Sequence, residues 1–397
     1  MDTQFSAAPQ EKLSQADTQK GKLFIGIPSE KSFQEKRIGL TPESVSILTH
    51  SGHQVVLQSK AGQASHFSDN DYSEAGAQIV YDTKDVFQAD IIVKATPPNI
   101  AELNHYKSGQ TIISPLHLPT LSHELIAALI QKKIIGLAFE YIKDESGVFP
   151  IVQAMSEIAG NQAITIASDL LSNSNTGIGI MLGGISGVAP TQVLILGSGT
   201  VAEFAARTAL GMGATVKIFD NNLYKLKRLQ NHLGTRIYTS VLYLDVLQKE
   251  LENADVVIGA VHSPSGRTPV LVSEEMVAKM KRGAVIIDVS IDQGGCFETS
   301  EIGSHDNPIF IKYDVVHYCV PNIAARVART ASYAISSVLM PLLTKTSDCQ
   351  GIENYVKQSH QASNGLYLFK GAVTNRYLAQ HFNQRYSDPA ILFGNQY

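Results

Sequence analysis

The stretch over residues 192–222 restricts the fold of this chain more than any other. It opens with an apolar run, 193–196, which predicts a buried parallel strand. A G-x-G-x-x-A turn follows at 197–202, then a helical pattern, and a second apolar strand over 215–219 that ends at Asp220. Strand, glycine turn, helix, strand and acid, in this order, are the fingerprint of a dinucleotide-binding Rossmann unit. The alternative is a glycine turn that only packs a helix against a strand.

The turn contains the residue types that a bound pyrophosphate requires. Gly197 permits the tight bend, Gly199 leaves the backbone open to phosphates, and Ala202 is small enough for the helix to pack on the strand. The free N–H groups and the positive dipole end of the helix would face the same phosphates. We therefore predict cofactor contacts from the whole turn: Gly197, Ser198, Gly199, Thr200, Val201 and Ala202.

The acid at the end of the second strand indicates which dinucleotide is bound. A carboxylate at Asp220 accepts hydrogen bonds from a ribose and repels a 2′-phosphate, which favours NAD over NADP. Lys225, Lys227 and Arg228 come soon after, and Lys225 is kept as a candidate cofactor contact. A solvated helix face is the alternative for these three residues.

Length and composition exclude several classes of protein. A chain of 397 residues is long enough for two domains, and 44% hydrophobic with 17% charged residues is typical of a globular protein. The net charge of −4 offers no basic surface for nucleic acid, and no apolar run is long enough to span a membrane. Three cysteines without metal-site spacing favour a reduced cytoplasmic location with neither disulfides nor a metal. Residues 1–21 lack the features of a signal or transit peptide, and we expect a flexible tail there.

Candidate strands alternate with helical stretches through the first 150 residues. Thr41-Pro42 marks the start of one helix, with Thr41 as its N-cap. Such alternation predicts a doubly wound parallel sheet. The candidate strands are residues 23–27, 55–58, 79–80, 91–94, 111–114 and 134–139.

A long helical pattern over 152–171 can carry the chain from one domain to the next. A second helical stretch, 327–343, is expected to return to the first domain, because the second sheet already has its strands: 193–196, 215–219, 236–238, 256–260, 284–289 and 315–318. We therefore predict an α/β protein with two doubly wound, Rossmann-like parallel-sheet domains separated by a cleft. Residues 22–150 and 329–397 would form a substrate domain, and residues 151–328 an NAD-binding domain.

Polar residues near the carboxyl ends of strands are the candidates for the site, because ligands of open parallel sheets bind there. Arg37 and Lys94 could anchor a substrate carboxylate. His117 is suited to carrying protons near neutral pH, and Asp292 lies in a glycine-rich loop that could approach a ligand closely. Strand ends of the second domain add further candidate cofactor contacts: Ala260, Val261, Ile291 and Asn322.

Each of these candidates also has a purely structural interpretation. Arg37 could form a surface ion pair with Glu35, His117 could be a core histidine, and Asp292 could cap a turn. A lysine at the end of an apolar strand is unusual, and the residues alone leave the role of Lys94 open.

Taken together, the motifs resemble the alanine dehydrogenase family, which includes the NAD-binding subunit of proton-pumping transhydrogenases. The likeness runs in order from about residue 22 to the C-terminus. It is carried by IGIPSE at 25–30, KRIGLTP at 36–42, IVK at 92–94, LHL at 116–118, MSEIAG at 155–160, the turn at 197–202 with Asp220, DVSIDQGG at 288–295, and the segment from His317-Tyr318 to Asn322.

The resemblance implies reversible, NAD-dependent oxidative deamination of L-alanine to pyruvate and ammonium. It implies that Arg37 and Lys94 hold the substrate carboxylate and carbonyl. His117 would be the acid–base partner of the reacting oxygen or nitrogen, and Asp292 would handle the attacking water. Ser156, in the motif of the crossing helix, would contact the cofactor. Family members assemble as hexamers, so we expect a homo-oligomer.

The sequence departs from the family beside the expected substrate. Pro115 stands where Tyr is usual, Pro119 replaces a small residue, Ser29 replaces Lys, and residues 323–328 replace Met-Pro-Gly-Ala-Val-Pro. Ala202 stands where the third glycine of the cofactor turn is usual. Another small amino acid is therefore an alternative substrate, as is a larger one in a dehydrogenase of the opine, saccharopine or lysine type.

Two other classes remain alternatives. A transhydrogenase subunit would pass hydride to a partner protein, but this chain lacks the long insertion that such a partner needs. A non-catalytic NAD-binding regulator would have no need of Arg37, Lys94, His117 and Asp292 together.

Overall fold

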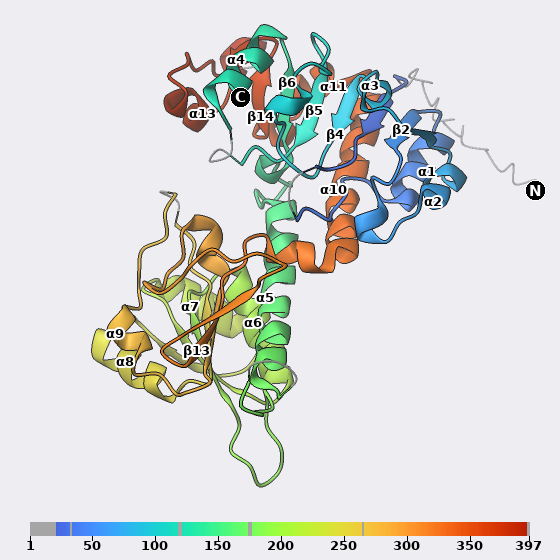
Figure 1. The fold of residues 1–397 in the computed structure, drawn as a ribbon. Coiled ribbons are helices and arrows are strands. Elements are labelled where there is room, and N and C mark those ends of the chain that lie inside the picture. Colours follow the sequence, from blue (N-terminus) through green and yellow to red (C-terminus); the bar gives the residue numbers. More distant parts are fainter. Residues whose placement is uncertain (1–20, 32–33, 118–120, 174–176, 264–265, 395–397) are drawn as a thin grey trace, which may run out of the picture.

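Two β-sheets, each flanked by helices, form two lobes of the protein (Figure 1). The structure is a computed structural model, and it describes residues 21–31, 34–117, 121–173, 177–263 and 266–394. The expected N-terminal tail lies outside the described residues apart from Gly21, and so do Leu118 and Pro119. Both sheets consist mainly of parallel strands, which confirms the predicted α/β class.

The first lobe contains an eight-stranded sheet in the order β15-β14-β6-β5-β4-β1-β2-β3. Six of its strands pair in parallel, as the alternating pattern predicts. The sequence does not predict β14 and β15, which pair antiparallel at one edge, because a short apolar run cannot be told from a helical segment by periodicity. The strands are β1 (Phe24–Ile27), β2 (Gln54–Gln58), β3 (Gln78–Val80), β4 (Ile91–Val93), β5 (Thr111–Ser114), β6 (Ile135–Ala138), β14 (Leu366–Phe369) and β15 (Ala372–Val373).

Helices from both ends of the chain cover this sheet. Pro42 begins α1 with Thr41 at its N-cap, as predicted. The long α10 packs on it, and Ser336 Oγ accepts the Thr41 N–H at 3.0 Å. The helices are α1 (Pro42–His50), η1 (Gln63–Ser65), α2 (Asp69–Glu74), α3 (Thr83–Val86), η2 (Ile100–Glu102), α4 (His123–Gln131), η4 (Phe139–Tyr141), α10 (Ala328–Asp348), α11 (Ile352–Gln358), α12 (His360–Ser363), α13 (Arg376–His381) and α14 (Pro389–Phe393).

The second lobe contains a seven-stranded sheet in the order β12-β13-β11-β10-β7-β8-β9. The predicted strand over 236–238 was placed two residues early, and β12 is an antiparallel edge strand that the sequence does not predict. The strands are β7 (Gln192–Leu196), β8 (Thr215–Phe219), β9 (Tyr238–Ser240), β10 (Val256–Gly259), β11 (Val285–Asp288), β12 (Ile309–Lys312) and β13 (Val315–Tyr318). The helices are α6 (Thr200–Gly211), α7 (Leu223–Leu233), α8 (Leu244–Asn253), α9 (Glu274–Val277), η5 (Val289–Gln293) and η6 (Ile323–Val327).

Helix α5 (Pro150–Leu171) runs from the first lobe along the second, as the long helical pattern predicts (Figure 1). It lies against α6 with no side chain between them at Gly160, where a Cβ atom would stand 2.4 Å from Val201 O. Only glycine allows two helices this close, so Gly160 ties α5 to the helix that follows the glycine turn.

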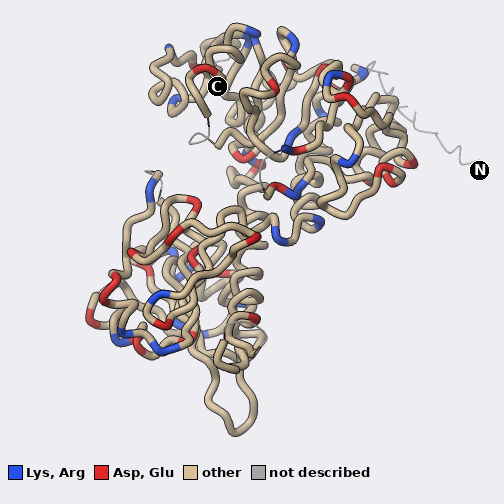
Figure 2. Tube along the Cα trace, in the orientation of Figure 1, with Lys and Arg blue, Asp and Glu red and all other residues tan. Residues whose placement is uncertain are grey.

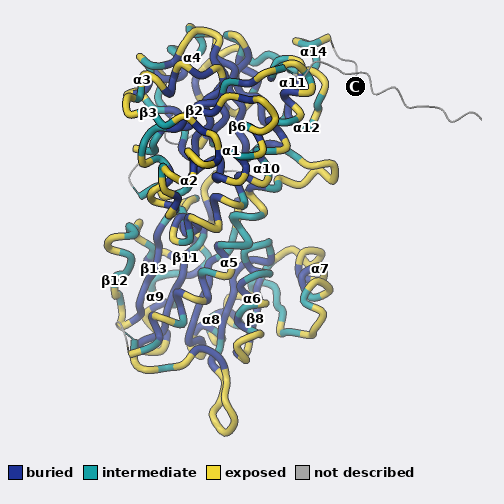
Figure 3. Tube along the Cα trace, turned by 90° about the vertical axis from the view of Figure 1, so that its right-hand side faces the viewer, coloured by how far each residue is buried: buried dark blue, intermediate teal, exposed yellow. Residues whose placement is uncertain are grey.

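Burial is concentrated in the central strands of both sheets (Figure 3). An arm over residues 177–190 extends away from the second lobe and carries no charged residue, whereas acidic and basic residues both lie where the lobes meet (Figure 2). The junction between the lobes therefore contains charged residues, and it is where Glu35, Asn322 and Asp292 of the candidate site meet.

Candidate active site

The glycine turn after β7 leaves open space at the start of α6. Gly197 has a φ of +104°, and a Cβ there would lie 2.4 Å from Ala260 O, so only glycine fits. A Cβ at Gly199 would meet no described atom within 4 Å. Gly199 is the N-cap of α6, whose first N–H groups have no acceptor within the helix. Open space before a helix N-terminus fits the pyrophosphate of a dinucleotide.

Asp220 is oriented by the turn itself. Ser198 Oγ donates to Asp220 Oδ2 at 2.6 Å, and Asn222 N–H donates to Asp220 Oδ1 at 2.7 Å. Ser198 is buried, so its hydroxyl fixes the carboxylate beside the glycine turn. Lys225 lies one turn into α7 and is exposed, in keeping with the solvated helix face proposed as its alternative.

The loops after β10 and β11 approach the same edge of the sheet. Val261 N–H donates to Ser290 Oγ at 2.9 Å, and Ile291 is buried beneath the loop that carries Asp292. Asp288 accepts bonds from Ser290 N, Cys296 N and Ser300 Oγ at 3.0, 2.9 and 2.7 Å, and therefore holds the shape of that loop. The structure thus gathers part of the predicted cofactor set at one edge: Gly197, Ser198, Gly199, Asp220, Ala260, Val261 and Ile291.

Arg37 is held by Glu35 in a two-pronged ion pair. Arg37 Nε and Nη2 donate to the two oxygens of Glu35 at 2.8 and 2.7 Å, so the ion pair considered as the structural alternative is present. It is not a surface pair, because the side chains are 14% and 5% exposed. The remaining nitrogen, Nη1, faces Met155 Sδ at 3.4 Å, next to Ser156 on α5. The pair therefore fixes the direction of the guanidinium group.

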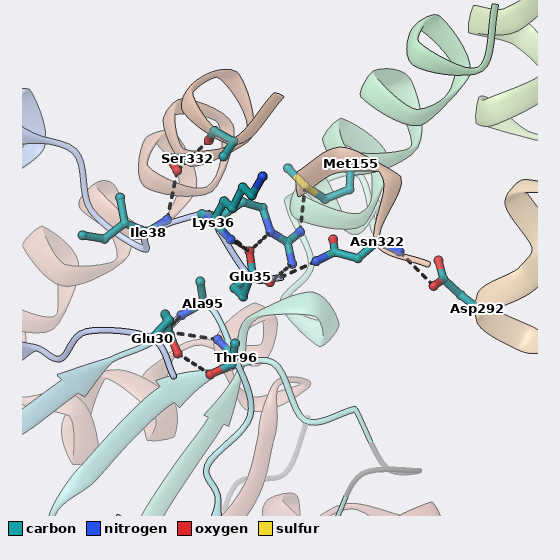
Figure 4. Close-up of polar contacts among 12 residues, drawn as sticks. Glu30, Glu35, Lys36, Ile38, Ala95, Thr96, Met155, Asp292, Asn322 and Ser332 are labelled. Carbon is teal, nitrogen blue, oxygen red and sulfur yellow. Dashed lines mark hydrogen bonds and ion pairs between the residues drawn. The ribbon is translucent and has the colours of Figure 1, made fainter. Parts of the chain in front are cut away.

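Asn322 joins this pair to the second lobe (Figure 4). Its Nδ2 donates to Glu35 Oε2 at 3.0 Å, and its backbone N–H donates to Asp292 Oδ1 at 3.1 Å. Asn322 has a φ of +53°, a conformation that asparagine tolerates better than most residues. Three predicted site residues, Arg37, Asp292 and Asn322, thus belong to one hydrogen-bonded chain that includes Glu35.

Burial and neighbouring charges together shift the pKa values of two carboxyl groups in this hydrogen-bonded chain in opposite directions. Burial alone would raise the pKa of Glu35, but the Arg37 guanidinium holds that pKa below its ordinary value. Protein atoms packed around the carboxyl raise the pKa of Asp292, against the lowering effects of the Asn322 N–H and of the charges of His117 and Arg37, although the residue as a whole is exposed. Glu35 therefore stays ionised, while Asp292 is closer to accepting a proton.

Lys94, in the first lobe, is enclosed by the carboxylates of Glu30 and Glu102. Its side chain has no exposed surface, Nζ forms an ion pair with Glu102, and Glu30 Oε2 lies 3.7 Å away. Tyr106 OH donates to the second oxygen of Glu102 at 2.9 Å. Glu30 is fixed in turn by Ala95 and Thr96 (Figure 4). Lys94 is thus a buried, charged residue at a strand end, and a substrate would reach Nζ only after these side chains move.

His117 follows β5 and is exposed, which excludes the core-histidine alternative. Its φ is +37°, a left-handed conformation that is uncommon outside glycine. The charge of His117 lowers the pKa of Asp292, so the two side chains interact electrostatically although they come from different lobes.

Sequence reasoning considered Glu35 only as a surface ion-pair partner of Arg37, and it missed two further carboxylates beside the predicted residues, Glu102 and Glu140. Glu35 accepts five hydrogen bonds, from Lys36 N, Arg37 N, Arg37 Nε, Arg37 Nη2 and Asn322 Nδ2. Its place two residues before an arginine was the available signal. A separate hollow beside α11, lined by residues such as Lys143, Lys345 and His360, contains none of the predicted site residues.

The sequence matches the models of two protein domains. Residues 26–159 match the model of the alanine dehydrogenase/PNT N-terminal domain, and residues 163–376 match that of the C-terminal domain. The chain belongs to the alanine dehydrogenase/PNT family. The two matched regions of the family meet within α5.

Relatives of both kinds within the family are similar over nearly the whole chain. Alanine dehydrogenase 2 of Staphylococcus aureus strain USA300 is 39% identical over 365 residues, which are 92% of this chain and 98% of the relative. A solved L-alanine dehydrogenase superposes with a TM-score of 0.85 at 35% identity, covering 90% of this chain and 99% of that one. A transhydrogenase from Sinorhizobium meliloti has the same fold, with a TM-score of 0.75 at 24% identity over 89% of this chain and 99% of its own.

Among the residues that the structure describes, no helix is both long and apolar enough to cross a membrane.

Proposed function

We propose that the protein catalyses the NAD-dependent, reversible oxidative deamination of L-alanine to pyruvate and ammonium. The observation that carries this proposal is the hydrogen-bonded chain Arg37–Glu35–Asn322–Asp292, which connects a carboxylate-binding arginine of one lobe to an acid of the other. The relatives described as alanine dehydrogenases, similar over more than nine-tenths of this chain, support the same reaction.

The cofactor side of the site is proposed from the glycine turn. Residues Gly197 to Ala202 would hold the pyrophosphate of NAD, and Asp220 would accept hydrogen bonds from the adenosine ribose. When bound, NAD supplies the acceptor for a hydride from the amino acid. Ser156, Lys225, Ala260, Val261, Ile291 and Asn322 are proposed as further contacts at the same junction.

The substrate side is proposed from the first lobe. Arg37 would bind the substrate carboxylate through its fork of N–H groups, and Lys94 would bind the carboxylate or the developing carbonyl once Glu30 or Glu102 yields. Because Glu35 already binds Nε and Nη2 of Arg37, Nη1, which faces the weak acceptor Met155 Sδ at 3.4 Å, is the atom expected to meet the substrate first.

Two residues are proposed to move protons. Addition of water to the oxidised substrate requires a base, and departure of ammonia requires an acid. His117 and Asp292 interact electrostatically, which supports our proposal that they share these tasks. The raised pKa of Asp292 suits it to accept the proton of an attacking water, because a base is most effective when its pKa approaches the working pH.

The same proposal includes the organisation of the protein. Residues 22–150 and 329–397 would form the substrate domain, and residues 151–328 the NAD-binding domain. We further propose a cytoplasmic homo-oligomer, with a hexamer as the expected form.

Formation of NADH with L-alanine at alkaline pH tests the function, with glycine, L-serine, L-valine and L-lysine as competing substrates. Turnover that depends on L-alanine and exceeds that with the other four supports the proposal. Turnover with another amino acid would move the specificity to the residues beside His117 and Asn322. NADH binding without turnover on any of them would contradict the proposal and favour a regulatory or transhydrogenase-like protein.

A further inference from the structure

The loops that follow β5 and β6 leave the first sheet side by side. Ser114 and Ala138, the last residues of these parallel strands, are partners in the sheet register. Two residues further along each chain, Leu116 N–H donates to Glu140 Oε1 at 2.6 Å. The N–H of His117 forms a hydrogen bond with the same carboxyl group. One side chain of η4 therefore holds two consecutive N–H groups of the loop that carries the candidate proton carrier.

The backbone that Glu140 holds is in an unfavourable conformation. His117 has a φ of +37°, which costs a residue with a side chain on the order of 1 kcal/mol relative to an extended conformation. Such a conformation persists only where surrounding contacts enforce it. Pro115 has no N–H, so Leu116 and His117 supply the first donors of this loop, and both bind Glu140.

We propose that Glu140 is a positioning residue that fixes the left-handed backbone of His117 and so directs the imidazole toward Asp292. The inference rests on the proposed function in one respect, since it takes His117 as the proton carrier of that reaction. It goes beyond that function because it assigns a role to Glu140, which is bonded to the backbone N–H groups of Leu116 and His117 and is not itself proposed to touch the substrate.

Two further observations support a role beyond packing. Glu140 Oε2 is buried and has no hydrogen-bond partner among the described residues, so the carboxyl group is kept in an environment that does not fully satisfy it. Burial also raises the pKa of Glu140 to about 7, against the lowering effect of the backbone N–H groups. The carboxyl group therefore changes charge near neutral pH, and it accepts N–H bonds more strongly when ionised.

The groups that face Glu140 do not titrate in its place. Tyr367 on β14 and Tyr141 on η4 both interact with it, and burial raises the pKa of each phenol further above its ordinary value. Among the described residues, His117 is the other titratable residue that contacts Glu140, and it does so through its backbone N–H. Because both tyrosines stay neutral at about pH 7, a pH dependence of kcat in that range can be assigned to the charge of Glu140 and not to Tyr367 or Tyr141.

The experiment uses the full-length protein with NAD and compares Glu140→Gln and Glu140→Leu with wild type. Glu145→Gln, a change of an exposed carboxylate in the next loop, is the matched control. Three quantities are measured: kcat with L-alanine between about pH 6 and about pH 9, the Kd for NADH, and amide hydrogen exchange of the peptide containing Leu116 and His117.

The inference predicts a specific pattern. Glu140→Leu lowers kcat by about tenfold or more, since a small misplacement of a reacting group has effects of this size, while the Kd for NADH stays within about twofold. Glu140→Gln keeps an acceptor oxygen but no charge, so its kcat equals wild type below about pH 6 and falls behind above about pH 8. Exchange at Leu116 and His117 accelerates in Glu140→Leu and is unchanged in Glu145→Gln.

Two results would overturn the inference. The first is a wild-type to Glu140→Gln ratio of kcat that does not change with pH, which would leave Glu140 a purely structural residue. The second is unaltered exchange at Leu116 and His117 in a folded Glu140→Leu protein. If Glu140→Leu does not fold, the pH dependence of Glu140→Gln decides. If wild type itself shows no turnover with L-alanine, the proposed function fails, and hydrogen exchange still decides whether Glu140 holds the loop.

Discussion

Asn322, which follows the second sheet, donates its side-chain amide to Glu35 of the first lobe at 3.0 Å. The contact crosses between segments 287 residues apart and ends on the carboxylate that grips Arg37. The arginine that we propose binds the substrate carboxylate is thereby oriented from the lobe that we propose binds NAD.

Replacement of Asn322 by glycine isolates this contact. Glycine keeps the positive φ and the backbone N–H to Asp292 but removes the donor to Glu35. We expect the KM for L-alanine to rise by about three- to tenfold, with a smaller change in kcat. A hydrogen bond to a charged group contributes about 1.5–3 kcal/mol, and only part of this reaches the substrate because Asn322 acts on Arg37 through Glu35. Steady-state kinetics at saturating NAD measure this. An unchanged KM would mean that Glu35 orients Arg37 without help from the second lobe.

Arg37→Lys keeps the positive charge but removes the fork that matches Glu35. The buried ammonium can satisfy only one edge of the carboxylate, so we expect the KM for L-alanine to rise by about tenfold or more. NADH binding, measured by fluorescence titration, should not change. Arg207→Lys is the matched control, because Arg207 pairs with Glu203 on the exposed side of α6. Equal effects of the two variants would contradict a substrate role for Arg37.

His117→Ala removes the candidate proton carrier from an exposed position, so little packing is lost. Turnover should fall by roughly 10²-fold or more, the usual contribution of an acid–base residue, while NADH binding stays near normal. Rates and binding are measured on the same preparation. A loss below about threefold would remove His117 from the mechanism.

Asp220→Ala tests the choice of cofactor. The carboxylate that Ser198 fixes would lie where a 2′-phosphate must go, so its removal should raise kcat/KM with NADPH by about tenfold, from the loss of about 1 kcal/mol of repulsion. Use of NADH should weaken at the same time, since a ribose acceptor is lost. Asp245→Ala, on the exposed α8, is the control. An unaltered preference for NADH would show that discrimination arises elsewhere.

The raised pKa of Glu140 makes a prediction about stability. Below pH 4.5, its ordinary value, the carboxyl is protonated in both folded and unfolded chains. Between that value and about 7 the folded protein keeps a proton that the unfolded chain releases, so unfolding becomes easier as the pH rises. The difference corresponds to about 3 kcal/mol at most. The Tm of Glu140→Gln relative to wild type should therefore increase from about pH 5 to about pH 8. A constant difference in Tm would contradict the raised pKa.

The sequence predicted what depends on local pattern. The strand and helix around Gly197, the strands of both sheets that alternate with helices, and the long crossing helix all follow from periodicity and turn chemistry. These elements place Gly197 and Asp220 directly after β7 and β8, Arg37 between β1 and α1, and Asn322 between β13 and η6.

The sequence could not predict which side chains bind the candidate site residues. Lys94 could be recognised as unusual, but its partner Glu102 comes from η2, and its burial depends on the packing of the whole lobe. The contact of Asn322 with Glu35 joins distant segments, and local periodicity carries no information about such pairs. The antiparallel strands β12, β14 and β15 were missed for a related reason, because an antiparallel strand can join a sheet without the helical connection that parallel strands require.

Gly160 gives helix α5 a mechanical role. Because no side chain separates it from α6, α5 is in direct backbone contact with the first turns of α6. Met155, five residues earlier on the same rigid rod, rests against the one nitrogen of Arg37 that Glu35 leaves free. Helix α5 therefore connects the glycine turn, where we propose that the dinucleotide binds, with Arg37, which we propose binds the amino acid.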